Sequence, residues 1–156
     1  PEVMRFLGNG QVVPGLEAQR AWLAERIERY HSSVLNGFGV WAAVERDTQK
    51  VVGTLILKPL PPTDNEIEIG WHLNRRTWGK GYASEGAKSV MRYGFVELRL
   101  DRILAVIKPG NVRSVAVAER IGMLYLERTM RSYAGKELDV FVIERESYNE
   151  FQGLSS

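Results

Sequence analysis

The sequence contains no cysteine and only two histidines, His31 and His72. The absence of cysteine excludes disulfide bonds, thiolate metal sites and a cysteine nucleophile. Two isolated histidines do not make the cluster of ligands that a zinc site requires, so we expect no metal site. A chain without cysteine is compatible with the cytoplasmic location that we expect.

Long apolar runs and a strong net charge are also missing. No apolar run approaches the roughly eighteen residues of a membrane-spanning helix, and no signal peptide is visible, so no membrane partner is expected. A net charge of +2 over 156 residues is too small to indicate nucleic-acid binding. The length and the ordinary composition, 44% hydrophobic and 26% charged, predict one globular domain over residues 1–156.

A glycine-containing turn between a strand and a helix is the most informative stretch of the chain. The alternation of Glu66–Leu73 predicts a strand, and the apolar spacing from about Tyr82 to Leu98 predicts an amphipathic helix. Gly79 and Gly81 therefore precede a helix N-terminus, where unpaired N–H groups and partial positive charge favour a phosphate. The alternative is a tight turn in which the glycines only provide positive φ angles.

Positive charge is concentrated around this turn. Residues 71–120 contain ten basic and four acidic side chains, a net charge of +6, so the remaining residues carry −4. Such a field favours a compact polyanionic ligand. The turn is not a dinucleotide fingerprint, because Ser84 replaces the third glycine, and no P-loop run G-x-x-x-x-G-K-[ST] is present.

Two segments resemble the acetyl-coenzyme A signature of the GNAT N-acetyltransferase superfamily. The first is R-x-x-G-x-G at residues 76–81, and the second is N-x-x-S-x-x-x-x-E-[KR]-x-G-[FM] at residues 111–123. With residues 1–7 and 135–140 they are similar to the branch of the ribosomal-protein N-terminal (alanine/serine) acetyltransferases. The resemblance covers nearly the whole chain, but the family's first strand and helix do not precede Pro1. We therefore expect a chain that is truncated at its N-terminus relative to the family.

This resemblance implies a single-domain α/β fold with a central, mixed and mostly antiparallel twisted sheet, splayed at the cofactor site and flanked by helices. It implies acetyl-CoA as the cofactor and direct transfer of the acetyl group to a primary amine, with a protein or peptide N-terminus as the expected acceptor. Alternatives are an amino acid, polyamine or aminoglycoside acceptor, for which the acids Asp64, Glu66 and Glu68 would suit a cation, and non-catalytic modules that bind an acyl-CoA or another polyanion. The oligomeric state stays open, and a homodimer is compatible with the sequence.

The resemblance also assigns the cofactor site. Backbone N–H groups from Trp78 to Ala83 are expected to bind the pyrophosphate, with added charge from Arg76 and Lys80. Gly70 predicts a bulge or a close backbone approach, and the resemblance implies both: a bulge that separates the strand from its neighbour, and freed backbone groups that hold the pantetheine arm and the thioester oxygen. The expected cofactor-binding residues are Trp71, Leu73, Arg76, Trp78, Gly79, Lys80, Gly81, Tyr82, Ala83 and Asn111, the last with helix N-capping as its alternative role.

Acetyl transfer to an amine requires the neutral amine. Deprotonation at pH 7.4 costs about 4 kcal/mol for a lysine but about 1 kcal/mol for a protein α-amine, so an α-amine needs only a weak base. Glu68 is the preferred base, acting through a water, with Glu66 and His72 as other candidates and a solvated strand face as the alternative explanation. Many family members carry a tyrosine acid where this chain has Ala118, and we expect Ser114 to take that role.

The remaining elements follow from periodicity and turn residues. They are a helix from Pro14 to about Val34, strands over Phe38–Arg46, Val51–Pro59 and Arg102–Lys108, a helix over Asn111–Ile121, a hairpin of Leu124–Tyr133 with Lys136–Arg145, and a loose tail over Phe151–Ser156.

Overall fold

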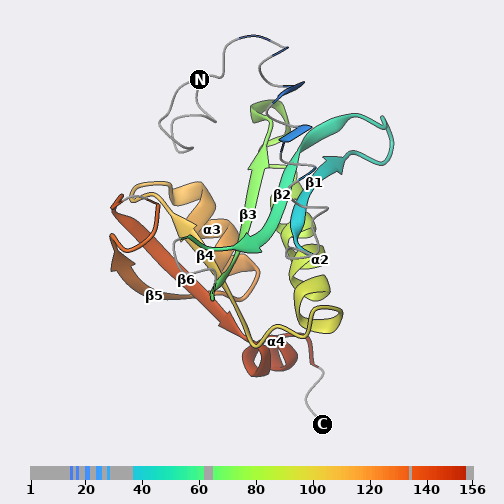
Figure 1. Cartoon of the computed structure of the whole chain (residues 1–156). Coiled ribbons are helices and arrows are strands. Elements are labelled where there is room, and N and C mark those ends of the chain that lie inside the picture. The colour runs from blue at the N-terminus through green and yellow to red at the C-terminus, as the bar shows by residue number, and fades with distance from the viewer. Residues whose placement is uncertain are drawn as a thin grey trace.

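The computed structural model describes residues 37–61, 65–133 and 135–153, together with a few isolated residues between 15 and 28. The segment 1–7, most of the helix expected over residues 14–34, and Asp64 lie outside the described residues. The described part forms one six-stranded sheet with three α-helices (Figure 1). None of these helices is long and apolar enough to cross a membrane.

The sheet has the strand order β1-β2-β3-β4-β6-β5. All neighbouring strands are antiparallel except β3 and β4, which run parallel. This confirms the predicted mixed, mostly antiparallel sheet. The strands are β1 Gly39–Val44, β2 Val51–Pro59, β3 Ile67–Leu73, β4 Arg102–Ile107, β5 Leu124–Thr129 and β6 Leu138–Glu144.

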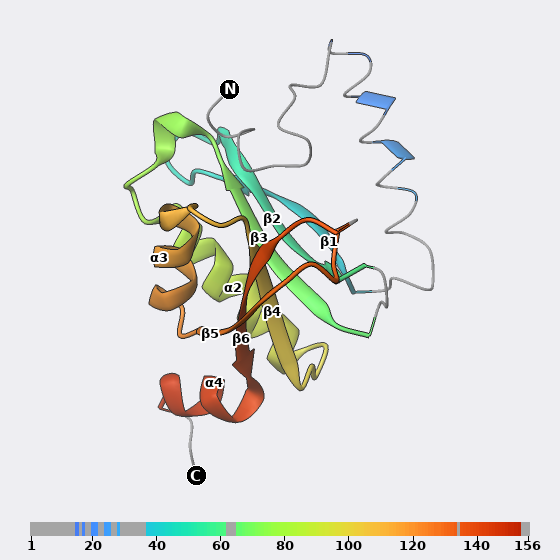
Figure 2. The same cartoon turned by 90° about the vertical axis from the view of Figure 1, so that its left-hand side faces the viewer.

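Helices cover one side of the sheet. The helix α2 spans Tyr82–Val96 and α3 spans Val112–Arg120, which confirms both predicted helices, and a short 3-10 helix, η3, precedes them at Arg75–Thr77. Figure 2 shows α2 and α3 on the same side of the strands. The sequence did not predict α4, Arg145–Phe151, which follows β6 directly.

Two apolar clusters lie on opposite faces of the sheet. The main core packs α2, α3 and α4 against the strands, with Leu57, Ile103 and Ile121 fully buried. The smaller cluster is built on Leu104, Val140 and Leu60. Neighbouring residues of β4 therefore point to different cores, as the two-residue period of a strand requires.

The predicted separation of the sheet occurs between β3 and β4. Within these strands the ladder pairs a single position, Glu68 with Leu104, and the strands diverge beyond it. The bulge expected at Gly70 is not found in the β2–β3 ladder, whose register runs unbroken through that residue. The divergence of β4, and not an inserted residue, therefore frees the edge of β3.

Candidate active site

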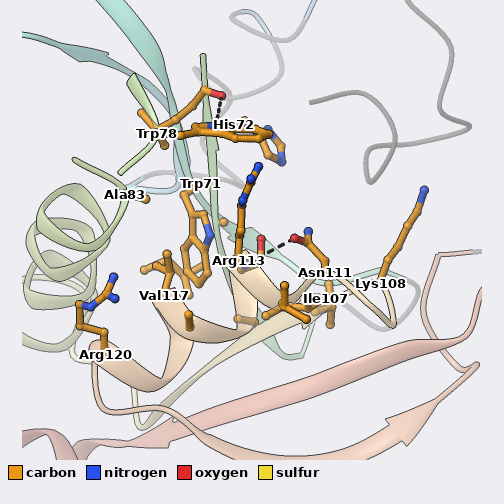
Figure 3. A pocket seen from close by; sticks show the side chains of 18 of the residues that line it. Trp71, His72, Trp78, Ala83, Ile107, Lys108, Asn111, Arg113, Val117 and Arg120 are labelled. Carbon is orange, nitrogen blue, oxygen red and sulfur yellow. Dashed lines mark hydrogen bonds between the residues drawn. The ribbon is translucent and has the colours of Figure 1, made fainter. Parts of the chain in front are cut away.

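A groove of about 850 Å³ occupies the gap between β3 and β4. One wall is β3 with the turn that follows it, and the other is the end of β4 with the first turns of α3 (Figure 3). Trp71 and Val117 face each other across it in Figure 3. The lining includes Trp71, His72, Leu73, Trp78, Gly79, Ala83, Lys108, Asn111, Arg113, Ser114, Val117 and Arg120.

The glycine turn opens the helix α2 in the way that the sequence predicts. Gly79 and Gly81 have φ angles of 80° and 83°, a region that L-residues rarely adopt. The first hydrogen bond into α2 runs from the N–H of Glu85 to the C=O of Gly81 at 3.0 Å, so the N–H groups of residues 82–84 have no intrahelical partner. The turn thus presents free donors and the positive end of the helix dipole.

The space in front of both glycines is open. A Cβ atom built on Gly79 or Gly81 would meet nothing within 4 Å. Gly81 and Tyr82 line a smaller hollow of about 310 Å³, which shares Leu73, Trp78 and Gly79 with the main groove. An anion can therefore approach the backbone of the turn without displacing protein atoms.

Trp78 fixes the position of the turn through its side chain. Its Nε1 donates a hydrogen bond to the carbonyl of Leu73 at 3.0 Å, and its own N–H donates to the carbonyl of Arg75 at 3.2 Å. The guanidinium of Arg113 stacks on its indole ring at 4.4 Å from the centroid. Trp78 therefore connects β3 to α3 across the groove, and its N–H is engaged elsewhere.

Lys80 and Tyr82 turn away from the groove toward Glu45, which follows β1. The Tyr82 hydroxyl donates to Glu45 Oε1 at 2.5 Å, and Lys80 Nζ lies 3.6 Å from the same oxygen. Hydrogen bonds from Thr48 and from Tyr82 lower the pKa of Glu45, and the bond to Glu45 raises the pKa of Tyr82. Glu45 thus ties the β1–β2 hairpin to the glycine turn.

The first turns of α3 bring polar and basic groups to the groove. Asn111 caps the helix, because its Oδ1 accepts the N–H of Ser114 at 3.3 Å, which confirms the capping role. Ser114 is half-buried and lines the groove. Arg120 lies one turn beyond Val117 and donates to the hydroxyl of Ser84 at 3.2 Å. The groove wall is therefore cationic where it faces the glycine turn.

Glu68 does not line the groove but immediately precedes Ile69, which does, and it lies at the one position where β3 pairs with β4. Its side chain is 8% exposed, so the alternative of a solvated strand face is wrong. Lys58 Nζ lies 2.8 Å from its Oε1, and the Tyr133 hydroxyl also donates to this oxygen. Glu66, in contrast, pairs with Arg102 Nε at 2.8 Å and is more exposed.

The structure brings together most of the predicted cofactor residues and separates a few. Arg76 and Lys80 are exposed and line neither hollow, whereas the other eight line one or both. Ala118 is fully buried in the main core, so a side chain at this position does not face the groove. The sequence analysis counted Arg113 and Arg120 in the positive charge around the turn but did not assign them to the cofactor site, although with Val117 they recur at spacings of four and three on one helix face.

The fold and the groove agree with the comparison with known proteins. The family model described as an acetyltransferase (GNAT) domain matches residues 1–124. The chain belongs to the GNAT acetyltransferase family. This result confirms the resemblance at the level of the family.

Three relatives illustrate the membership. The uncharacterized protein YkkB of Bacillus subtilis is 39% identical over 116 residues, which cover 72% of this chain and 65% of that protein. The FsC-acetyl coenzyme A-N(2)-transacetylase of Aspergillus fumigatus is 29% identical over 146 residues, which cover 85% of this chain and 57% of that protein. The chain thus spans less than two thirds of the length of both. A solved structure from Vibrio cholerae, provisionally named a ribosomal-protein-serine acetyltransferase, is 28% identical with a TM-score of 0.66, and the match covers 82% of this chain and 74% of that chain.

Proposed function

We propose that the protein is an acetyl-CoA-dependent N-acetyltransferase that transfers the acetyl group directly to a primary amine. The observation that carries this proposal is the glycine turn with its free N–H groups, placed at one side of a groove that separates β3 from β4. A parallel ladder that stops after one pairing leaves the β3 backbone edge next to this groove. Such an arrangement suits an elongated ligand with an anionic end.

The residues present fit acetyl-CoA, which supplies an activated acetyl thioester when it is bound. The N–H groups from Gly79 to Ala83 would hold the pyrophosphate, since no protein atom fills the space before either glycine. Arg113 and Arg120 supply positive charge from α3. The edge of β3 near Trp71 would hold the pantetheine arm. The Aspergillus fumigatus relative, whose name includes acetyl coenzyme A, supports this cofactor.

For the acceptor we propose a protein or peptide N-terminal amine. The ribosomal-protein-serine acetyltransferase name of the Vibrio cholerae relative supports this choice. An α-amine loses its proton at a cost of about 1 kcal/mol at pH 7.4, so it places little demand on a base. Glu68 accepts the proton of the amine, directly or through a water, and Ser114 donates a proton toward the leaving sulfur. Ser114 lines the groove from α3, and Glu68 immediately precedes Ile69, the first β3 residue that lines it.

Thiol release from acetyl-CoA, followed over a panel of acceptors, tests this function. The panel contains peptides with free and with blocked N-termini, amino acids, spermidine and an aminoglycoside. We expect release with free N-termini only, and its loss in Gly79→Trp, whose indole fills the open space before the turn. Gly153→Trp is the matched control, because Gly153 also has a positive φ and open space but lies after α4.

Three outcomes contradict the proposal. If calorimetry shows no binding of coenzyme A to the wild-type protein, the cofactor assignment is wrong. Release that requires spermidine or an amino acid, and is absent with peptides, would replace the N-terminal acceptor by a small molecule. Binding without release for any acceptor would indicate a non-catalytic acyl-CoA module.

A further inference from the structure

Lys58, Glu68 and Tyr133 form a small polar cluster on the sheet face opposite the helices. Lys58 lies on β2 and Glu68 on β3, while Tyr133 comes from the loop between β5 and β6. Lys58 Nζ donates to the Tyr133 hydroxyl at 2.8 Å and lies 2.8 Å from Glu68 Oε1. Because the Tyr133 hydroxyl also donates to Oε1, two donors converge on one carboxylate oxygen.

The second oxygen of this carboxylate is different. Glu68 Oε2 is buried and has no hydrogen-bond partner among the residues that the structure describes. A buried oxygen without a partner is costly, and an ion pair that served only to join β2 to β3 would be expected to satisfy both oxygens. The side chains of Lys58 and Glu68 are only 15% and 8% exposed, so bulk water does not account for the asymmetry.

The position of Glu68 connects the cluster with the groove. Glu68 shares its face of β3 with Gly70 and His72, which both line the groove. Glu68 pairs with Leu104, and Tyr133 packs against the small apolar cluster of Leu60, Leu104 and Val140. The unsatisfied oxygen therefore belongs to a residue at the point where the strands separate.

We propose that Lys58 and Tyr133 are positioning residues, which occupy Oε1 and leave Oε2 as the single acceptor for the amine of the substrate. This inference rests on the proposed acetyltransferase function. Oε2 takes, relayed by a water, the proton that the amine nitrogen loses as its bond to the acetyl carbon forms. The bond from that carbon to sulfur breaks, and the sulfur leaves with the electron pair. The leaving sulfur takes a proton from the hydroxyl of Ser114. Lys58 then lacks a charged partner, which favours loss of the proton from Glu68 before the next turnover.

The charge of the cluster also bears on the acceptor. One cation and one anion leave it formally neutral, so it offers no net negative charge to a polycation. Other charged groups that the structure describes on this face include Glu66, which pairs with Arg102, Glu144, which lies opposite Arg102 on β6, and His72 and Lys108, which line the groove. The cluster therefore favours an amine that arrives neutral, such as an α-amine.

The test compares Lys58→Met and Tyr133→Phe with wild type in steady-state kinetics over pH, with a free N-terminal peptide as acceptor. We expect kcat to fall by about tenfold or more in Lys58→Met and less in Tyr133→Phe, because a positioned base contributes at least a hundredfold. The KM for acetyl-CoA stays unchanged, and the acidic limb of the pH–kcat profile moves in both variants. Lys58→Arg restores part of kcat, and Tyr125→Phe, an exposed tyrosine on β5, is the matched control.

Thermal unfolding provides a readout that does not depend on activity. Lys58→Met leaves the buried carboxylate unpaired, so the double variant Lys58→Met/Glu68→Gln is expected to unfold at a higher temperature than the single variant. Absence of this coupling would overturn the cluster as a unit. Wild-type kcat and pH profile in Tyr133→Phe, which removes only a hydroxyl and is expected to fold, would overturn the positioning role alone. A wild-type protein that transfers no acetyl group would overturn the proposed function and this inference together.

Discussion

Replacement of Gly81 by alanine tests whether the glycine turn binds the cofactor or only reverses the chain. Gly81 has a φ of 83°, and a Cβ there meets no atom within 4 Å, so the cost to the fold is backbone strain alone. A left-handed conformation costs an L-residue about 1–2 kcal/mol. For a chain of this length that corresponds to a fall in Tm of about 2–8 °C.

The effect on cofactor affinity has a different origin. An alanine that relaxes toward negative φ rotates the N–H groups of the turn, and one lost hydrogen bond to a charged group is worth about 1.5–3 kcal/mol. The Kd for coenzyme A is therefore expected to rise by about ten- to a hundredfold, as measured by calorimetry beside a thermal melt. Gly153→Ala is the control, since its φ of 68° and open surroundings impose similar strain away from the groove. A Gly81→Ala protein that melts early but binds coenzyme A like wild type would refute the cofactor assignment of the turn.

Two further predictions concern the core and the turn. Leu57→Ala empties a fully buried position of the main core and is expected to lower the free energy of unfolding, measured with denaturant, by about 3–5 kcal/mol. Val51→Ala, at a position on the same strand that is 64% exposed, is expected to change it little. Equal effects of the two substitutions would contradict this assignment of the core. Glu45→Gln removes a carboxylate whose pKa is held below the ordinary 4.5 by hydrogen bonds from Thr48 and Tyr82. The stability that this carboxylate contributes is present above pH 4.5 and lost as pH falls through the lowered pKa, so the Tm difference from wild type should shrink on acidification, and a difference independent of pH would contradict it.

The parts of the fold that were predictable from sequence are those with a local periodic signal. The strand before the turn alternates over seven residues, and α2 repeats its apolar residues over four turns, so each element could be found without tertiary information. The separation of β3 from β4 was expected from the family resemblance, but the bulge at Gly70 was not found, since the β2–β3 register runs unbroken through the pairing of Ile56 with Gly70. A glycine at position 70 is compatible with either a bulge in β3 or a neighbouring strand that diverges from it, so the sequence alone did not distinguish the two.

The helix α4 and the environment of Glu68 could not be predicted because they depend on contacts between distant residues. The α4 residue Tyr148 stacks on Phe95 with the ring centroids 4.7 Å apart. A helix of seven residues is too short for its apolar periodicity to predict this contact. Lys58 and Tyr133 are 75 residues apart and meet only because β2 and the β5–β6 loop reach the same face of the sheet. The alternation of side chains along β3 predicts which face of the sheet Glu68 lies on. The residues that it contacts on that face depend on which strands and loops the topology brings next to it.

The same topology suggests a division of charge between the two sides of the separated strands. On the helix side, Arg113 and Arg120 surround a turn with free N–H groups, which favours a polyanion. On the other side, each described acid next to or within β3 is already matched by a cation, Glu66 by Arg102 and Glu68 by Lys58. A polyamine acceptor would need uncompensated acids there, whereas a single neutral amine needs one free carboxylate oxygen. Glu68 Oε2 is buried and has no hydrogen-bond partner among the described residues, and the peptide N-terminus that we propose as the acceptor rests on this oxygen.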